Sequence, residues 1–194
     1  MSRCTQPLDA AILADYWLGG LPVSEEDAVE AHLLACDDCA SRLRETVALA
    51  EAVRDVVRQG NLLMVVSETF LDRLSEQGLR VREYAPPNSG SVACTVGLED
   101  DFLIGHLAAD LSAASRVDLS LCDAQGVERA RLADIPFDPG GGRVSFQQPI
   151  GYAKAAPSET MIARLLGFDR EGRQRLLGEY TFNHTRTIPG PPGW

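Results

Sequence analysis

Apolar side chains recur at helical spacing along the first 78 residues. Leu8, Ile12 and Tyr16, for example, follow one another at every fourth position. Four helices are predicted: one that begins near Pro7 and stops at Gly19-Gly20, one that starts at Ser24, one over residues 40–59 and one over residues 67–77. The N-terminal part of the chain is therefore expected to be a three-helix bundle with a fourth helix after it.

The fourth predicted helix has a distinct apolar strip. Phe70, Leu71 and Leu74 share one face, and acidic side chains flank them. An amphipathic strip of this kind suits a groove on a partner protein, and the same strip could instead pack on the chain's own bundle or on its second half. We name these three residues as candidate partner-binding residues.

After residue 79 the apolar positions follow a period of two. Val117, Leu119 and Leu121 alternate with polar residues, and strand-like runs at 161–168 and 176–182 flank a polar turn. Short alternating runs without interleaved helices are typical of an antiparallel β-sandwich. The predicted fold class is α+β with several domains, divided into a helical domain over 1–62, a fourth helix and linker over 63–90, and a β-sandwich sensor or docking domain over 91–194.

Charge and hydropathy narrow the classes of partner. The net charge is −10 at pH 7, and the acidic excess is concentrated in the first 60 residues. This argues against direct binding of nucleic acid, and it suggests a basic partner unless the acidic residues simply form a solvated surface. The longest apolar run, Leu62–Val66, is far shorter than the roughly 20 residues that span a bilayer. A cytoplasmic protein without a membrane contact is expected.

One cluster of residues has the spacing of a metal site. His32, Cys36 and Cys39 form an H-x3-C-x2-C motif, in which His32 and Cys36 lie one helical turn apart. Cys39 follows the predicted end of that helix, where the chain can turn back toward the same point. Thiolates and imidazole are the ligands of tetrahedral zinc, although a buried His beside two apolar Cys side chains would give the same spacing. Asp37 and Asp38, between the thiols, are expected to raise the pKa of the thiols.

The motif and its surroundings resemble a known family. Three stretches carry the resemblance: Trp17-Leu18-Gly19-Gly20-Leu21, Ser24-Glu25-Glu26 and the stretch from Val29 through Cys39. They are similar to the zinc-binding anti-sigma factors of bacteria, and the similarity extends over about residues 5–75. The resemblance implies an N-terminal helical domain that binds an extracytoplasmic-function sigma factor and blocks its access to RNA polymerase. It also implies zinc held by His32, Cys36, Cys39 and an upstream ligand. Cys4 is the upstream candidate, although an alignment on Trp17 places Pro7 near the expected position.

The second half supplies no motif that would support a different activity. His106 and His184 stand alone in strand-like segments, and Cys94 and Cys122 have no CxxC partner, so they are expected to be buried thiols. We therefore expect an inhibitor of transcription initiation that acts by occlusion and is not an enzyme, with no small-molecule substrate identified. The alternatives are a zinc-thiol redox sensor or scaffold for a partner other than a sigma factor and, less favoured, a metalloenzyme with an open coordination position.

Overall fold

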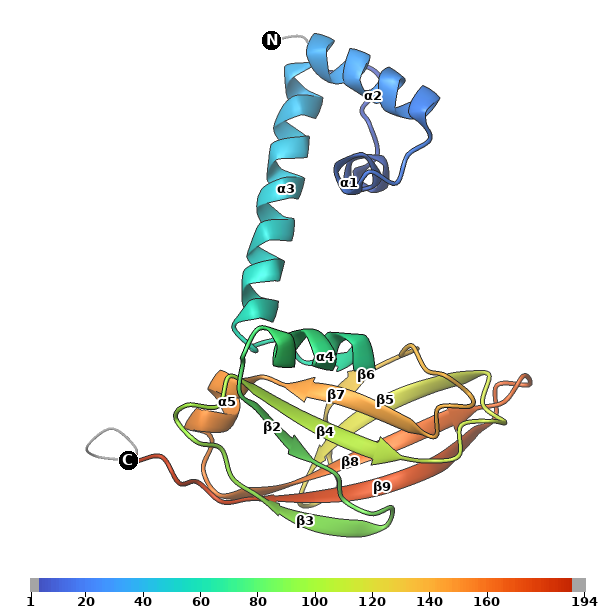
Figure 1. The fold of residues 1–194 in the computed structure, drawn as a ribbon. Helices are drawn as coiled ribbons and strands as arrows, with labels where there is room; N and C mark the ends of the chain where they lie inside the picture. Colours follow the sequence, from blue (N-terminus) through green and yellow to red (C-terminus); the bar gives the residue numbers. More distant parts are fainter. Residues whose placement is uncertain (1–3, 190–194) are drawn as a thin grey trace. The chain divides into compact units, whose positions relative to one another are not determined.

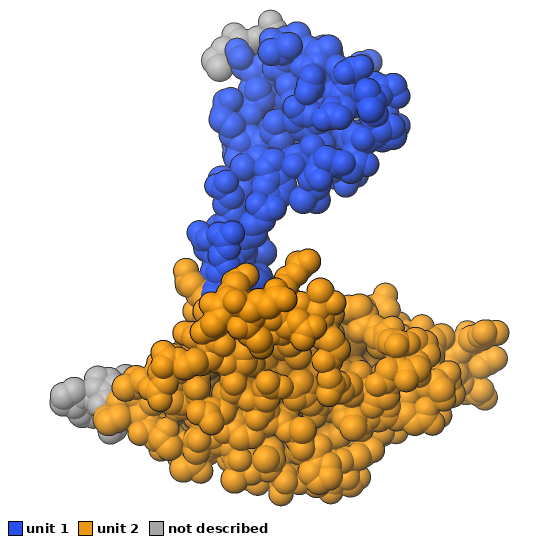
Figure 2. Space-filling view, in the orientation of Figure 1, with its two compact units in different colours: residues 1–58 blue, residues 59–194 orange. Residues whose placement is uncertain are grey.

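The computed structural model describes residues 4–189, and these residues divide into two compact units. Residues up to Arg58 form the first unit and residues from Gln59 onward form the second (Figure 2). The first unit contains α1 (Ala10–Leu18), α2 (Val23–Ala35) and α3 (Asp37–Arg58). No helix within residues 4–189 has both the length and the apolar character needed to cross a membrane.

Local signals at the helix ends explain most of the first unit. The Asp9 side chain caps α1 by accepting a hydrogen bond from the Ala11 N–H, and Gly19 ends that helix at a positive φ of 69°. The core is small, with Leu13, Val29 and Cys39 as its buried apolar side chains in the described residues. A core of this size provides little hydrophobic stabilisation.

Two predicted helix starts are displaced in the structure. The second helix begins at Val23, directly after Pro22, so Ser24 lies inside the first turn and does not cap it. The third helix begins at Asp37 and not at residue 40, because the Ala40 N–H already closes a turn onto the Cys36 carbonyl oxygen. Two aspartates in the first turn of α3 favour this early start through the helix dipole.

The second unit consists of two β-sheets with two short helices (Figure 1). The four-stranded sheet has the order β1-β7-β4-β2 and the five-stranded sheet has the order β3-β9-β8-β5-β6. The strands are β1 (Met64–Val66), β2 (Val81–Tyr84), β3 (Gly90–Cys94), β4 (Phe102–Ala108), β5 (Arg116–Asp123), β6 (Glu128–Leu132), β7 (Arg143–Gln148), β8 (Glu159–Phe168) and β9 (Gln174–His184). The helices are α4 (Glu68–Glu76) and α5 (Ile150–Ala155).

The expectation of a purely antiparallel sandwich is wrong, because both sheets are mixed. Strand β2 pairs in parallel with β4, and β3 pairs in parallel with β9, whereas the other pairs are antiparallel. Both exceptions are edge strands, and they follow one another in the chain. Side chains alternate between the two faces in either kind of pairing, so the sequence pattern does not reveal strand direction.

Residues 63–90, which the sequence pattern separates as a helix and linker, contribute β1, α4 and β2 to the second unit. Strand β1 pairs with β7, and Ser67 caps α4 by accepting a hydrogen bond from the Phe70 N–H. The apolar strip of α4 faces the four-stranded sheet. Leu74 is 5% exposed, Leu71 is half-buried, and the Phe70 ring makes an edge contact with Phe102 of β4 at 6.2 Å between centroids. The chain's own sheet therefore occupies much of the predicted partner-binding strip.

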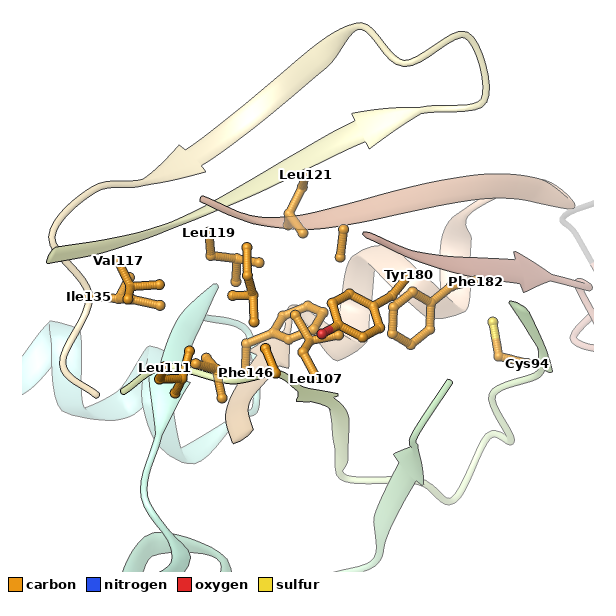
Figure 3. Close-up of a cluster of buried hydrophobic side chains, with 14 residues drawn as sticks. Cys94, Leu107, Leu111, Val117, Leu119, Leu121, Ile135, Phe146, Tyr180 and Phe182 are labelled. Carbon is orange, nitrogen blue, oxygen red and sulfur yellow. The ribbon is translucent and has the colours of Figure 1, made fainter. Parts of the chain in front are cut away.

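The main core of the second unit lies between the two sheets (Figure 3). Alternating residues Val117, Leu119 and Leu121 of β5 point into it, as the period-two pattern predicts. The ring of Phe146 from β7 meets that of Phe182 from β9 edge to face, with 6.1 Å between the centroids. Both sheets thus contribute aromatic and branched side chains to one continuous core.

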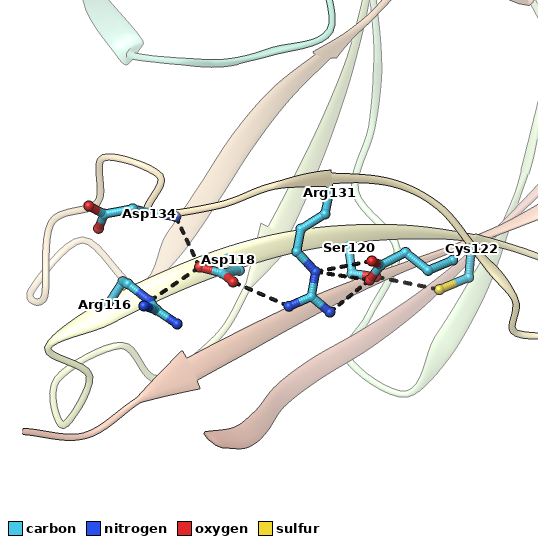
Figure 4. Close-up of polar contacts among 7 residues, drawn as sticks. Arg116, Asp118, Ser120, Cys122, Arg131 and Asp134 are labelled. Carbon is cyan, nitrogen blue, oxygen red and sulfur yellow. Dashed lines mark hydrogen bonds and ion pairs between the residues drawn. The ribbon is translucent and has the colours of Figure 1, made fainter. Parts of the chain in front are cut away.

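The outer face of β5 has a buried polar network, shown in Figure 4. Asp118 is 3% exposed; one carboxylate oxygen accepts from the Asp134 N–H at 2.9 Å and the other lies 3.3 Å from Nη1 of Arg131. Arg131 also binds Glu128, and Glu128 accepts a hydrogen bond from Ser120. Arg116 and Arg131 both contact Asp118. Asp118 and Ser120 are therefore buried although they lie on the outer face of the sheet.

We expect Asp118→Asn to lower the free energy of unfolding of the second unit by about 1–2 kcal/mol, because the contacts with Arg116, Arg131 and the Asp134 N–H lose the negative charge of the carboxylate. The loss stays modest because Arg131 keeps Glu128 as a partner. Urea unfolding at pH 7 measures it, with Asp72→Asn on the exposed side of α4 as the matched control. Equal effects of the two substitutions would contradict a structural role for the network.

Candidate metal centre

The structure brings all four predicted ligands together in the first unit. The Sγ atoms of Cys4, Cys36 and Cys39 and a ring nitrogen of His32 all lie within 4.8 Å of one another. Cys4 Sγ is 3.6 Å from His32 Nε2 and 3.9 Å from Cys39 Sγ. Cys39 is fully buried and the other three are half-buried. These residues form one compact cluster of three thiols and one imidazole.

Three of these side chains are placed by the junction of two helices. His32 lies in the last turn of α2, Cys36 is the single residue between α2 and α3, and Cys39 lies in the first turn of α3. Because Cys36 has an extended backbone, with φ −136° and ψ 101°, the two helices change direction there. The sharp junction turns Cys39 back toward the end of α2, as the spacing of the motif predicts.

The fourth side chain, Cys4, arrives on the segment that precedes α1. Hydrogen bonds hold this segment against the start of α3: the Cys4 N–H donates to Asp38 at 3.2 Å and the Leu8 N–H donates to Cys39 Sγ at 3.5 Å. Arg42 donates to the Leu8 carbonyl oxygen at 2.7 Å. The segment is not helical before Asp9, so Cys4 reaches the cluster despite its offset from the family spacing. Sequence reasoning did not identify Asp38 and Arg42 as the residues that fix it.

The environment of the thiol differs from one cysteine to the next. Hydrogen bonds from the Cys39 and Asp38 N–H groups, at the start of α3, hold the pKa of the Cys36 thiol below its usual value. Burial raises the pKa of the Cys4 thiol. The expectation that the neighbouring aspartates raise the pKa is therefore wrong for Cys36, because the backbone amides of the helix N-terminus dominate there.

The cluster fits tetrahedral zinc. Bonds of about 2.0–2.3 Å place tetrahedral ligand atoms roughly 3.3–3.8 Å apart, close to the distances observed around Cys4. Three cysteines and one histidine supply four protein ligands, which is the pattern of structural zinc sites; catalytic sites keep one position for water. Bound zinc would cross-link the N-terminal segment, the end of α2 and the start of α3.

Aromatic residues of α1 connect it to the other helices of this unit. The Arg54 guanidinium of α3 lies 4.4 Å from the centroid of the Trp17 ring, and the Tyr16 hydroxyl donates to Glu30 of α2 at 3.3 Å. Trp17 belongs to the stretch that carries the family resemblance. The zinc cluster and these contacts together fix the arrangement of the three helices.

The single histidines and cysteines of the second unit lie apart from this centre. His106 bridges three neighbouring strands, with Nδ1 2.8 Å from the Ser145 hydroxyl and Nε2 2.7 Å from a carboxylate oxygen of Glu83. Cys94 and Cys122 are 8% and 2% exposed, which confirms the expectation of buried thiols. Across residues 4–189, the four-residue cluster of the first unit is the group with metal-site geometry.

Comparison with known proteins agrees with this assignment. Residues 10–40 match the family model described as "Putative zinc-finger", a zinc finger of the anti-sigma factor type. The match covers α1, α2 and three of the four ligands. Comparison with curated proteins gives no match. Among solved structures, the N-terminal domain of phage TP901-1 ORF48 is similar over 55% of this chain and 98% of that chain, at 11% identity and a TM-score of 0.33, which carries no argument about function.

Proposed function

We propose that this protein is an anti-sigma factor: its helical unit binds an extracytoplasmic-function sigma factor and blocks transcription initiation until a signal releases it. The observation that carries the proposal is the cluster of Cys4, His32, Cys36 and Cys39, three of which lie in a zinc finger of the type typical of anti-sigma factors. The activity is occlusion by binding, so it requires an accessible surface and no catalytic group.

The first unit offers an accessible apolar surface for such a partner. Leu49, Val53 and Val56 follow one another on α3 at spacings of four and three, and they are 68%, 48% and 39% exposed. Leu18 of α1 and Leu34 of α2 are 64% and 90% exposed. Groups of exposed apolar side chains on a small unit favour a protein interface. We place the sigma-binding surface on the α3 row, here called the α3 stripe (Leu49, Val53 and Val56).

The placement of α4 changes how the predicted strip would take part. In our proposal the strip contacts a sigma factor only if α4 leaves the four-stranded sheet, because Leu74 is buried against that sheet. The strip consists of Phe70, Leu71 and Leu74. The acidic excess of the first 60 residues supports a basic partner surface, such as the one with which a sigma factor binds DNA.

Co-expression with extracytoplasmic-function sigma factors of the same genome tests the proposal. We expect a complex with one copy of each chain on size exclusion, and we expect the double variant Leu49→Glu and Val53→Glu to weaken it at least tenfold by placing two charges in the α3 stripe. Leu176→Glu, at a 56% exposed position of the second unit, is the matched control.

The outcomes separate the proposed functions. A complex that survives both charge substitutions in the α3 stripe would contradict the assigned surface. A zinc-loaded protein that forms no complex with the sigma factor would contradict the anti-sigma function, and it would favour a zinc-thiol redox sensor or a scaffold for another partner.

A further inference from the structure

We propose that a cavity inside the second unit binds a small, uncharged and largely apolar molecule that carries one hydroxyl or carbonyl group. The cavity is lined entirely by residues of the second unit and measures about 650 Å³. Typical small-molecule sites measure about 300–1,000 Å³. The proposal does not depend on the identity of the partner of the helical unit.

The cavity lies between the two sheets at one end of the sandwich. Its walls include Ile104 and Phe146 from the four-stranded sheet, and Leu121, Met161 and Phe182 from the five-stranded sheet. Helix α5 borders it through Tyr152 and Ala153. The lining is therefore mainly apolar and aromatic, as in sites that bury most of a ligand's surface.

Small side chains contribute to this space. Cys94 and Ala130 line the cavity, whereas leucines and Tyr180 fill the core further along the sheets. Figure 3 shows Cys94 at one end of the buried cluster, beyond Phe182 and apart from the leucines. Protein interiors are normally close-packed, whereas this cavity is partly open to solvent and is lined by residues of both sheets.

Two polar groups in the lining have hydrogen-bonding capacity to offer a ligand. Nε2 of His184 is buried and has no hydrogen-bond partner among the described residues. The Gln148 amide donates to the thioether of Met161, which is a weak acceptor. Buried polar groups nearly always have a partner, so Nε2 of His184 marks a place where the hydroxyl or carbonyl of a ligand would bind, and the half-buried Gln148 amide is a second donor in the lining.

The charges around the cavity argue against an anionic ligand, and its mainly apolar walls argue against burying a charge of either sign. Burial holds the pKa of His184 below its usual value, although Glu159 opposes this, so the ring is neutral at pH 7. Arg129 is paired with Asp123 at 2.7 Å, which neutralises the cation at the rim. Glu159 also lines the cavity and would repel an anion such as a fatty acid.

Fluorescence titration of the full-length protein with the neutral probe N-phenyl-1-naphthylamine tests the site. We expect saturable binding of one probe per chain with a micromolar Kd. Each of the single variants Cys94→Phe and Ala130→Phe places a large side chain in the cavity and should weaken binding at least tenfold. Two separate variants are used so that a folding defect in one does not decide the test. Ala93→Phe is the matched control, because Ala93 precedes Cys94 on β3 but is exposed.

A second measurement tests the polar recognition. Displacement of the probe by 1-naphthol should require at least a fivefold lower concentration than displacement by naphthalene, and His184→Leu should remove this preference. Binding that is absent in the wild type, or that is as tight in both filled variants as in Ala93→Phe, would overturn the cavity as the site. Equal displacement by the two competitors in the wild-type protein would overturn the hydroxyl or carbonyl requirement.

Discussion

Cys39→Ser is expected to abolish zinc binding and to unfold the helical unit, while the second unit stays folded. Cys39 is fully buried, and it contacts both Cys4 and the Leu8 N–H. Its loss therefore removes a ligand and also frees the N-terminal segment that carries Cys4. A serine hydroxyl is a poor substitute for a thiolate as a zinc ligand.

The size of the effect follows from how little else holds this unit together. Structural zinc contributes on the order of 10–16 kcal/mol in zinc-finger peptides at pH 7. The described core of the first unit consists of Leu13, Val29 and Cys39, and burial of a large apolar side chain gives only about 1.5–3 kcal/mol. The free energy of zinc binding exceeds the hydrophobic stabilisation from this core, so the unit is expected to unfold without zinc.

Elemental analysis and circular dichroism of protein prepared without oxygen measure both parts of the prediction. The wild type should contain about one zinc per chain, and Cys39→Ser should contain none and show a reduced helical signal. Cys122→Ser is the matched control, since Cys122 is a buried thiol of the second unit whose neighbours Ser120 and Arg164 can accommodate a hydroxyl. A metal-free wild type with an intact helical unit would contradict the structural role of zinc.

The metal centre was largely predictable because its geometry is local. The H-x3-C-x2-C spacing places His32, Cys36 and Cys39 around one helix junction, whatever the rest of the chain does. The position of Cys4 was less predictable, because hydrogen bonds from its segment to Asp38 and Arg42 of α3 hold it at the cluster. These bonds depend on how the segment before α1 packs. The effect of the α3 N-terminus on the Cys36 thiol was missed because the sequence pattern placed the start of that helix three residues too late.

The sheets were predictable only in part, because strand pairing is not local. Val117, Leu119 and Leu121 identified an inward face, and the polar turn at 169–172 identified the β8–β9 hairpin. Nothing in the alternation of β2 or β3 specifies a parallel neighbour. The packing of Phe70 and Leu74 on the sheet depends on tertiary contacts that an amphipathic pattern leaves open. Short α5 was not predicted, since its six residues show little periodicity.

Alkaline pH is expected to destabilise the second unit through one buried tyrosine. Tyr180 is fully buried, its hydroxyl donates to the Ala108 carbonyl oxygen, and burial raises its pKa from the usual 10.0 to about 12. The folded state thus binds the phenol proton more tightly than the unfolded state. Its contribution to stability is complete below pH 10, falls as the unfolded chain ionises, and is lost above pH 12. Two pKa units correspond to about 3 kcal/mol in total, of which roughly 1.4 kcal/mol is lost by pH 11.

Tyr180→Phe isolates this effect, because it removes the titrating group and keeps the ring. At pH 7 the variant should be about 1 kcal/mol less stable than the wild type, since the Ala108 carbonyl loses its donor. Near pH 11 the two proteins should become equally stable, and at higher pH the variant should be the more stable one. Urea unfolding from pH 7 to pH 11.5 measures the pH at which the two unfolding free energies become equal. In a titration followed by absorbance at 295 nm, Tyr180→Phe should lack the tyrosine that ionises at the highest pH. If the difference in unfolding free energy stays constant across this range, the Tyr180 hydroxyl does not titrate as its burial requires.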